Sequence, residues 1–130
     1  MKNQIVTEKS MSRDDFSEDD LLVILDGKQI RTQDEFFIAI EKAFRFPTEC
    51  KNNFDIFMDW IRDLWWIPEK SINVVIHNQR YFLSEDLALK KGLMKYFEED
   101  ILPFWEHDVL NCMVGGECKK FMVYLVDELL

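Results

Sequence analysis

Three short apolar runs, separated by stretches with helical periodicity, constrain the fold of this chain more than any other feature. The runs cover residues 21–25, 72–77 and 121–126, and each has the length and composition of a buried strand. Strands that alternate with helical segments are joined by crossover connections, which favour a parallel sheet. We therefore predict an α/β fold in which a small, three-stranded, mostly parallel sheet packs with helices.

Two helices are predicted between the first two strands. Thr32, with a glutamate three residues later, forms a reciprocal capping pattern, and Pro47 ends this first helix because proline lacks a backbone N–H. A second helix that runs to about residue 65 follows Asn52-Asn53, and either asparagine side chain can accept hydrogen bonds from the first free amides. Residues 84–107 have the apolar spacing of a longer helix. Helices thus account for both crossovers between the predicted strands.

The length of 130 residues fits one domain with a core that needs neither metals nor disulfides. Residues 1–19 are polar, carry an acidic cluster that begins at Asp14, and show no apolar periodicity. We expect them to form a mobile leader that is either solvated or in contact with a partner. Residues 20–130 are expected to form the single folded domain.

The charge balance restricts the partners of the chain. A formal net charge of −9 disfavours direct binding to nucleic acid and to an anionic membrane. Acidic small domains associate rapidly with basic proteins, because complementary fields steer the encounter. The odd number of cysteines and the absence of an apolar signal segment at the start indicate a reduced, cytoplasmic protein. No cofactor is expected.

Several short motifs follow one another in the first half of the chain. They are Leu25-Asp26-Gly27, Ile30, Phe36-Phe37, Ala43-Phe44-Arg45-Phe46-Pro47, and Asn53-Phe54-Asp55 followed by Asp59. Their order and spacing resemble the barstar family of ribonuclease inhibitors, and the similarity extends over about residues 21–126. The resemblance implies a three-stranded parallel sheet flanked by helices, with a binding surface on the second helix and the loop before it.

The resemblance also implies a function and a set of site residues. In that family this surface fills the catalytic cleft of a small cytotoxic ribonuclease and protects the cell that makes the toxin. Asp59 matches the central acidic anchor, Asp55 matches its neighbour one turn earlier, and Glu99 matches a further acidic contact from the long last helix. We expect surrounding contacts from Glu49, Asn52 and Met58. The chain is then a monomer that binds a basic toxin, a ribonuclease, one to one, and is not an enzyme.

The chemistry of such a site follows from general principles. A nuclease must attract a polyanion, so its cleft concentrates Arg, Lys and His side chains. Carboxylates held on a rigid helix can occupy phosphate subsites in that cleft and accept charge-assisted hydrogen bonds. Asp59 is therefore interpreted as a mimic of a phosphate group.

The chain also departs from the family pattern. An aromatic-aromatic-glycine loop is usual before the asparagine, whereas this chain has Glu49-Cys50-Lys51, and Met58 stands where tryptophan is frequent. A left-handed backbone is costly for a residue with a Cβ atom, so Lys51 at the glycine position predicts a different loop conformation. These differences indicate a cognate toxin unlike the best-known one.

Other functions are open to the same residues. The fold could serve as an interaction or regulatory module for a partner that is not a nuclease, because fold does not fix function. Asp55, Asp59 and Glu99 could hold a divalent metal for phosphoester hydrolysis, although an acidic face would repel the substrate. The segment from His107 to Cys118 lacks the paired short spacings of a structural zinc site, so we interpret its cysteines as unrelated thiols.

Overall fold

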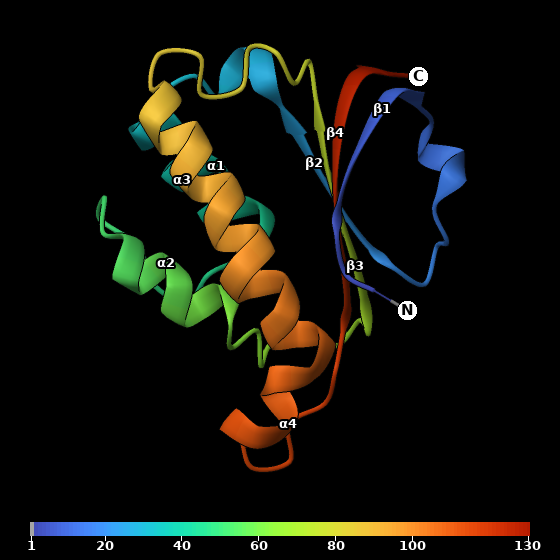
Figure 1. The fold of residues 1–130 in the computed structure, drawn as a ribbon, viewed down its shortest axis with the longest axis vertical. Helices are drawn as coiled ribbons and strands as arrows, with labels where there is room; N and C mark the ends of the chain where they lie inside the picture. The colour runs from blue at the N-terminus through green and yellow to red at the C-terminus, as the bar shows by residue number, and fades with distance from the viewer. Residues whose placement is uncertain (1) are drawn as a thin grey trace.

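The computed structural model describes residues 2–130 and has a parallel sheet with helices against it (Figure 1). All neighbouring strands are parallel, and their order across the sheet is β1-β4-β3-β2. The α/β class expected from the alternating pattern is therefore confirmed. The strands are β1 (Ile5–Met11), β2 (Leu21–Asp26), β3 (Ser71–His77) and β4 (Lys120–Leu129).

The sheet has four strands, so the prediction of three was wrong. The additional strand is β1, which lies within the segment expected to be a polar leader and pairs with β4 from Ile5–Val123 to Met11–Leu129. An edge strand gains its backbone hydrogen bonds whatever its side chains are, and most side chains of β1 are exposed or half-buried. A search for apolar periodicity cannot detect such a strand.

The helices between β2 and β3 begin at the residues that the sequence indicates. Thr32 and Glu35 form the reciprocal capping box of α1 (Gln33–Ala43). Asn53 caps α2 (Phe54–Ile61), and its side chain accepts a hydrogen bond from the N–H of Asp55. The helix α2 ends earlier than residue 65, because Leu64 takes a left-handed backbone conformation with φ of 49°.

The long helical segment after β3 is irregular. It starts with α3 (Leu87–Tyr96), continues as π-helical turns at Phe97–Ile101 and Phe104–Asp108, and ends with α4 (Val109–Cys112). Pro103 lies between the two π-helical turns and has no N–H to continue the ladder of hydrogen bonds. This irregularity determines which residues of the segment face α2.

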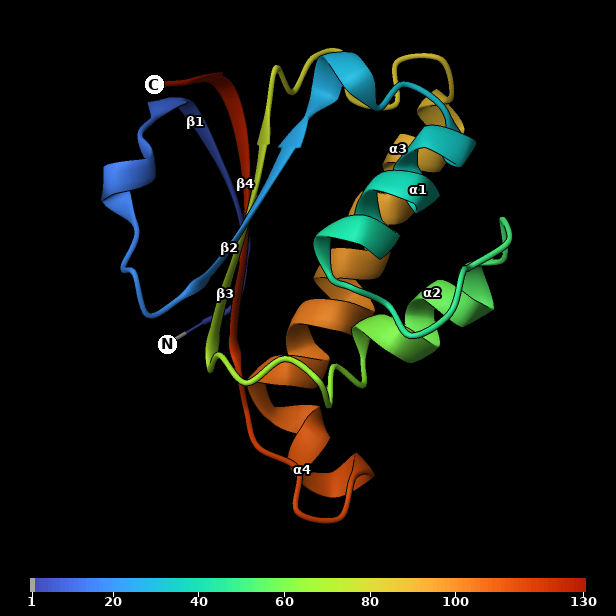
Figure 2. The same cartoon turned by 180° about the vertical axis from the view of Figure 1, so that it is seen from behind.

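The helices cover one face of the sheet, and the segment between β1 and β2 covers the other (Figures 1 and 2). On this second face the ring of Phe16 packs edge-on against Tyr124, with ring centres 5.4 Å apart. Asn73, which is buried, donates a hydrogen bond of 3.0 Å to the Asp20 carboxylate. The acidic segment therefore helps to cover the sheet and to satisfy a buried amide.

Asn3 ties the start of the chain to the helical layer and to β4. Its buried side-chain amide donates to the carbonyls of Leu102 and Lys119, at 3.2 and 3.0 Å, and its side-chain oxygen accepts from the N–H of Phe121 at 2.9 Å. A buried side chain that satisfies three backbone groups fixes the position of the segment that carries it.

We predict that Asn3→Ala lowers the free energy of unfolding by about 1–3 kcal/mol, because the buried N–H of Phe121 loses its acceptor. The matched control is Gln4→Ala, since the Gln4 side chain is exposed and the change should stay within about 0.5 kcal/mol. Urea unfolding followed by tryptophan fluorescence measures both variants. Equal losses of unfolding free energy in the two variants would contradict a stabilising role for the Asn3 hydrogen bonds.

Candidate functional site

The helix α2 has one buried face and one acidic, exposed face. Phe57 and Ile61 are fully buried in the core. Asp55 and Asp59 are both exposed and lie four residues apart, so their carboxylates project from the same side of the helix. The structure thus brings together the two acids that the family resemblance singles out.

Neither carboxylate is neutralised by the chain itself. Across residues 2–130, no Lys, Arg or His nitrogen lies within 4.0 Å of a carboxylate oxygen of Asp55 or Asp59. The N–H of Asp55 donates to the Asn53 side chain at 2.8 Å, a bond that involves no atom of the Asp55 carboxylate. The acidic face is therefore available to a partner.

Three contacts hold α2 rigidly against its surroundings. The indole N–H of Trp60 donates to the Thr48 hydroxyl at 2.8 Å, which ties the helix to the preceding loop. The indole N–H of Trp105 donates to the carbonyl of Ile61, also at 2.8 Å, and so holds the C-terminal end. The ring of Phe54 stacks on Tyr96 with ring centres 5.8 Å apart. The acidic face is consequently fixed in orientation.

The loop before α2 is a tight turn around a buried cysteine. The N–H of Cys50 donates to the Glu41 carboxylate at 2.7 Å, and the N–H of Asn53 donates to the carbonyl of Cys50 at 2.9 Å. Lys51 and Asn52, the two central residues, have φ of 51° and 57°. Two consecutive left-handed residues closed by such a bond are typical of a type I′ turn.

Lys51 therefore adopts the left-handed conformation that its Cβ atom makes costly, so this cost does not prevent the conformation here. The turn persists because the hydrogen bond to Cys50 and the buried Cys50 side chain offset the local cost. Asparagine, which tolerates this region better than most residues, occupies the second central position.

Glu49 and Asn52 lie at the exposed surface of this loop. They line the same shallow hollow, of about 330 Å³, together with Asp34 of α1. The two residues are thus close to the start of α2 and accessible to a partner.

Met58 differs from the other predicted contacts: it is only 8% exposed and packs in the core cluster, because it projects from the apolar side of α2. Its side chain therefore helps to pack α2 against the core.

Glu99 comes to the other end of α2. It is exposed on the π-helical turn after α3 and lines a hollow of about 240 Å³ with Arg62, the residue that caps α2 at its C-terminal end. The π-helical turns alter the register of this segment, which the spacing of apolar residues does not reveal. The long helical segment thus contributes an acid beside the α2 surface.

Two exposed aromatic residues near α2 lie outside the predicted set of partner contacts. Tyr96 is 40% exposed beside Phe54, and Trp65 is 72% exposed just after α2. The signal for Trp65 is present in the sequence, since two adjacent tryptophans cannot both face the core. Trp66 takes the inward position and donates to the carbonyl of Phe44 at 2.7 Å.

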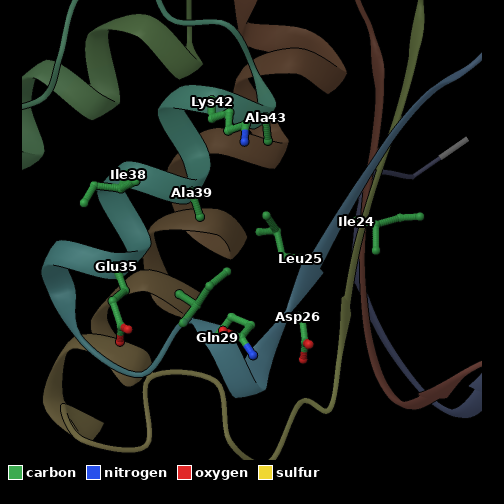
Figure 3. Close-up of a pocket in the computed structure, with 10 residues that line it drawn as sticks. Ile24, Leu25, Asp26, Gln29, Glu35, Ile38, Ala39, Lys42 and Ala43 are labelled. Carbon is green, nitrogen blue, oxygen red and sulfur yellow. The ribbon is translucent and has the colours of Figure 1, made fainter.

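Other parts of the structure offer little for catalysis or metal binding. In the described part of the chain, no group of three or more His, Cys, Asp or Glu side chains could hold a metal ion. The largely apolar hollow between β2 and α1, of about 580 Å³, has polar side chains such as Asp26 and Glu35 at its border (Figure 3). None of its lining residues is Ser, Cys or His.

Cys50 differs chemically from the other two cysteines. Burial raises the pKa of the Cys50 thiol to about 12, and the adjacent Glu41 carboxylate adds to the shift through its charge and a hydrogen bond. Cys112 and Cys118 are exposed and free. Cys50 is therefore a packing residue beneath the loop.

We predict that a thiol reagent at pH 8 modifies Cys112 and Cys118 rapidly, whereas Cys50 reacts only after unfolding, because its thiol is buried and protonated. The measurement is a count of reactive thiols with Ellman's reagent, in buffer and in denaturant. The variant Cys50→Ala should leave the count in buffer unchanged. Three rapidly reacting thiols in the native protein would contradict the placement of Cys50.

Comparison with known proteins agrees with this geometry. The sequence profile of the family described as Barstar (barnase inhibitor) matches residues 21–114, which include α1, the loop, α2 and Glu99. No curated protein and no solved structure shows a significant match to the chain. None of the helices formed within residues 2–130 is long and apolar enough to cross a membrane. By the extent of the profile match, this chain belongs to the barstar family.

Proposed function

We propose that this chain is an immunity-type inhibitor that neutralises a cytotoxic ribonuclease or a related toxin. It acts by placing the acidic face of α2 in the basic active site of the toxin, so that substrate cannot enter. The inhibitor works in the cytoplasm, is monomeric alone, and binds its target one to one without a cofactor. Family membership supports the class of target, since the family is described by its inhibition of barnase.

The observation that carries this proposal is the state of the two α2 carboxylates. Asp55 and Asp59 are exposed, share one side of a short helix, and form no ion pair within residues 2–130. The contacts of Trp60 and Trp105 fix that helix before any partner binds. Preorganised charges lose little entropy on association, which favours tight and specific binding.

Asp59 serves as the anchor, and Asp55 stands one turn closer to the N-terminal end of the helix. Cationic groups that bind the substrate's phosphates would bind these carboxylates in the same way, through charge-assisted hydrogen bonds. Further polar contacts come from Glu49 and Asn52 in the loop before α2, and from Glu99, which shares a hollow with Arg62 after α2. The surface therefore presents several acidic groups around one helix whose apolar side is buried.

The target of this chain differs from the target of the best-known inhibitor in the family. Met58 is buried where the family often presents an exposed tryptophan, so stacking on a catalytic base has no counterpart at that position. The exposed rings near α2 are instead Tyr96 and Trp65, at its two ends. A toxin with a differently shaped cleft fits this arrangement.

The immobilised chain should capture its target from an extract of the source cell, and mass spectrometry would identify it. The purified target should cleave RNA, and one molar equivalent of the chain should abolish that cleavage. Barnase and other small ribonucleases form a comparison panel. A captured protein without nuclease activity would instead support an interaction module with a partner that is not a nuclease.

We predict that Asp59→Ala weakens binding to the target ribonuclease about 30- to 5,000-fold. Truncating one partner of a desolvated charge pair costs about 2–5 kcal/mol, a range drawn partly from inhibitors of this same family. Isothermal titration calorimetry measures the dissociation constants. The loss arises mainly from the cation that is left unpaired in the cleft.

The matched control for this variant is Asp63→Ala, which removes a carboxylate from the turn just after α2. It should change affinity by less than about 3-fold, since peripheral charges contribute little. Circular dichroism should show that both variants fold like the parent. Equal and small effects of the two substitutions would remove Asp59 from its assigned role.

We also predict that the association rate constant falls steeply with ionic strength, by about 10-fold or more between 50 and 500 mM NaCl. The net charge of −9 and the exposed α2 acids attract a basic target over long range, and salt screens that attraction. Stopped-flow fluorescence of the tryptophans measures the rate. A rate independent of salt would argue against electrostatic steering.

A further inference from the structure

The carboxyl ends of the parallel strands carry an unusual group of basic and polar side chains. Figures 1 and 2 show the turn after β2 and the loop after β3 at the same end of the sheet as the C-terminus. Crevices at the carboxyl ends of parallel strands are where α/β proteins most often bind small ligands. None of the residues discussed below belongs to α2 or to the loop before it.

Three cations surround one aromatic ring at this end. The ammonium of Lys28 lies 5.4 Å from the centre of the Tyr81 ring, and the guanidinium carbons of Arg31 and Arg80 lie 5.1 and 5.7 Å from it. A fourth cation, Lys90 of α3, donates to the carbonyl of Gln79 at 3.1 Å. In a chain of net charge −9 with only 16 basic residues, this is a strong local reversal of sign.

Two of these cations, Lys28 and Arg80, line a polar pocket of about 600 Å³, a size suited to a small molecule. Its walls are Lys28 from the turn after β2, Asn78 to Tyr81 from the loop after β3, and Asp127 from β4. The Gln79 side-chain amide donates to the Asp127 carboxylate at 3.0 Å, which fixes two of these groups. Three neighbouring strands thus contribute to one site.

The neighbouring acids do not cancel these charges. The Asp26 carboxylate accepts hydrogen bonds from the N–H of Lys28 and the side chain of Asn78, at 3.0 and 2.9 Å. The Glu35 carboxylate is bonded to backbone N–H groups at the start of α1. Among the described residues, none of the cations around Tyr81 has a carboxylate oxygen within 4.0 Å. Asp26 and Glu35 therefore stabilise the local backbone turns, and the cations around Tyr81 can bind an anion.

The backbone around the pocket is held closely. Asn78 has a left-handed φ of 50°, and a Cβ atom at Gly27 would lie 2.3 Å from the Asn78 carbonyl oxygen. Only glycine lets the two turns approach this closely. The N–H of Gln79 donates to the carbonyl of Val126 at 3.1 Å and so ties the loop to β4. The pocket is consequently preformed, as ligand sites usually are.

Because Lys28 and Arg80 line a preformed polar pocket at the carboxyl edge of the sheet and Arg31 lies against the same Tyr81 ring, we propose a binding site for the phosphate group of a small phosphorylated metabolite. Arg80 and Lys28 bind the phosphate oxygens, and Arg31, which lies 5.1 Å from the centre of the Tyr81 ring, adds positive charge nearby. Asp127 and the amides of Asn78 and Gln79 are placed to bind hydroxyl groups on the rest of the ligand. This site is separate from the ribonuclease-binding face and does not depend on its function.

Ribose 5-phosphate is a suitable probe, with ribose as the control that lacks the phosphate. Titration of the full ¹⁵N-labelled chain at constant ionic strength should give saturable shifts at the amides of Lys28, Asn78 and Arg80. Arg80→Gln and Lys28→Gln should each weaken binding at least 10-fold, whereas Lys91→Gln, an exposed site on α3, should leave it unchanged.

Circular dichroism and urea unfolding of all three variants should match the parent, which shows that they fold whether or not the chain inhibits a ribonuclease. Shifts of equal size with ribose and with ribose 5-phosphate would overturn the proposal. So would an unchanged dissociation constant in both Arg80→Gln and Lys28→Gln. Saturable binding lost in those two variants alone would establish the site.

Discussion

The burial of one side of α2 is the constraint on which the account of this protein depends. Phe57, Met58 and Ile61 pack into a core shared with the sheet and the long helical segment, and this fixes the rotation of the helix about its axis. Asp55 and Asp59 must then face solvent. A short helix gains little stability from its own hydrogen bonds, so packing decides its orientation. The acidic surface is thus a consequence of the hydrophobic core.

The sheet supplies the platform for this arrangement. Its central strands are covered on one face by helices and on the other by the connection between β1 and β2. Buried polar groups hold that cover in place: Asn3 joins three backbone groups, and Asn73 is satisfied by Asp20. The acidic character of the N-terminal segment is compatible with this role, because most of its side chains stay in water.

Features encoded locally could be predicted from the sequence, and features that depend on distant partners could not. Thr32 and Asn53 identify the starts of α1 and α2, because a cap acts within its own turn. The strand β1 was missed, since it is stabilised by pairing with β4 more than a hundred residues away. The left-handed Lys51 was also unexpected, because the interactions that stabilise it come from the tertiary setting of Cys50.

The candidate site divides in the same way. Asp55 and Asp59 follow from helical spacing on a capped helix, so the structure places them together as expected. The burial of Met58 depends on how α2 rotates against the core, which spacing alone does not determine. The position of Glu99 beside Arg62 depends on π-helical turns, for which the sequence carries no clear signal other than Pro103.

The central claim is that the α2 carboxylates occupy the place of substrate phosphates in the active site of a ribonuclease. Competition measures this most directly: the chain, bound to its captured ribonuclease, is titrated with a non-cleavable dinucleotide. If the two ligands compete for one site, the apparent dissociation constant of the complex rises linearly with the concentration of free dinucleotide and does not level off. An affinity unchanged at saturating dinucleotide would contradict it, because the two ligands would then bind different places.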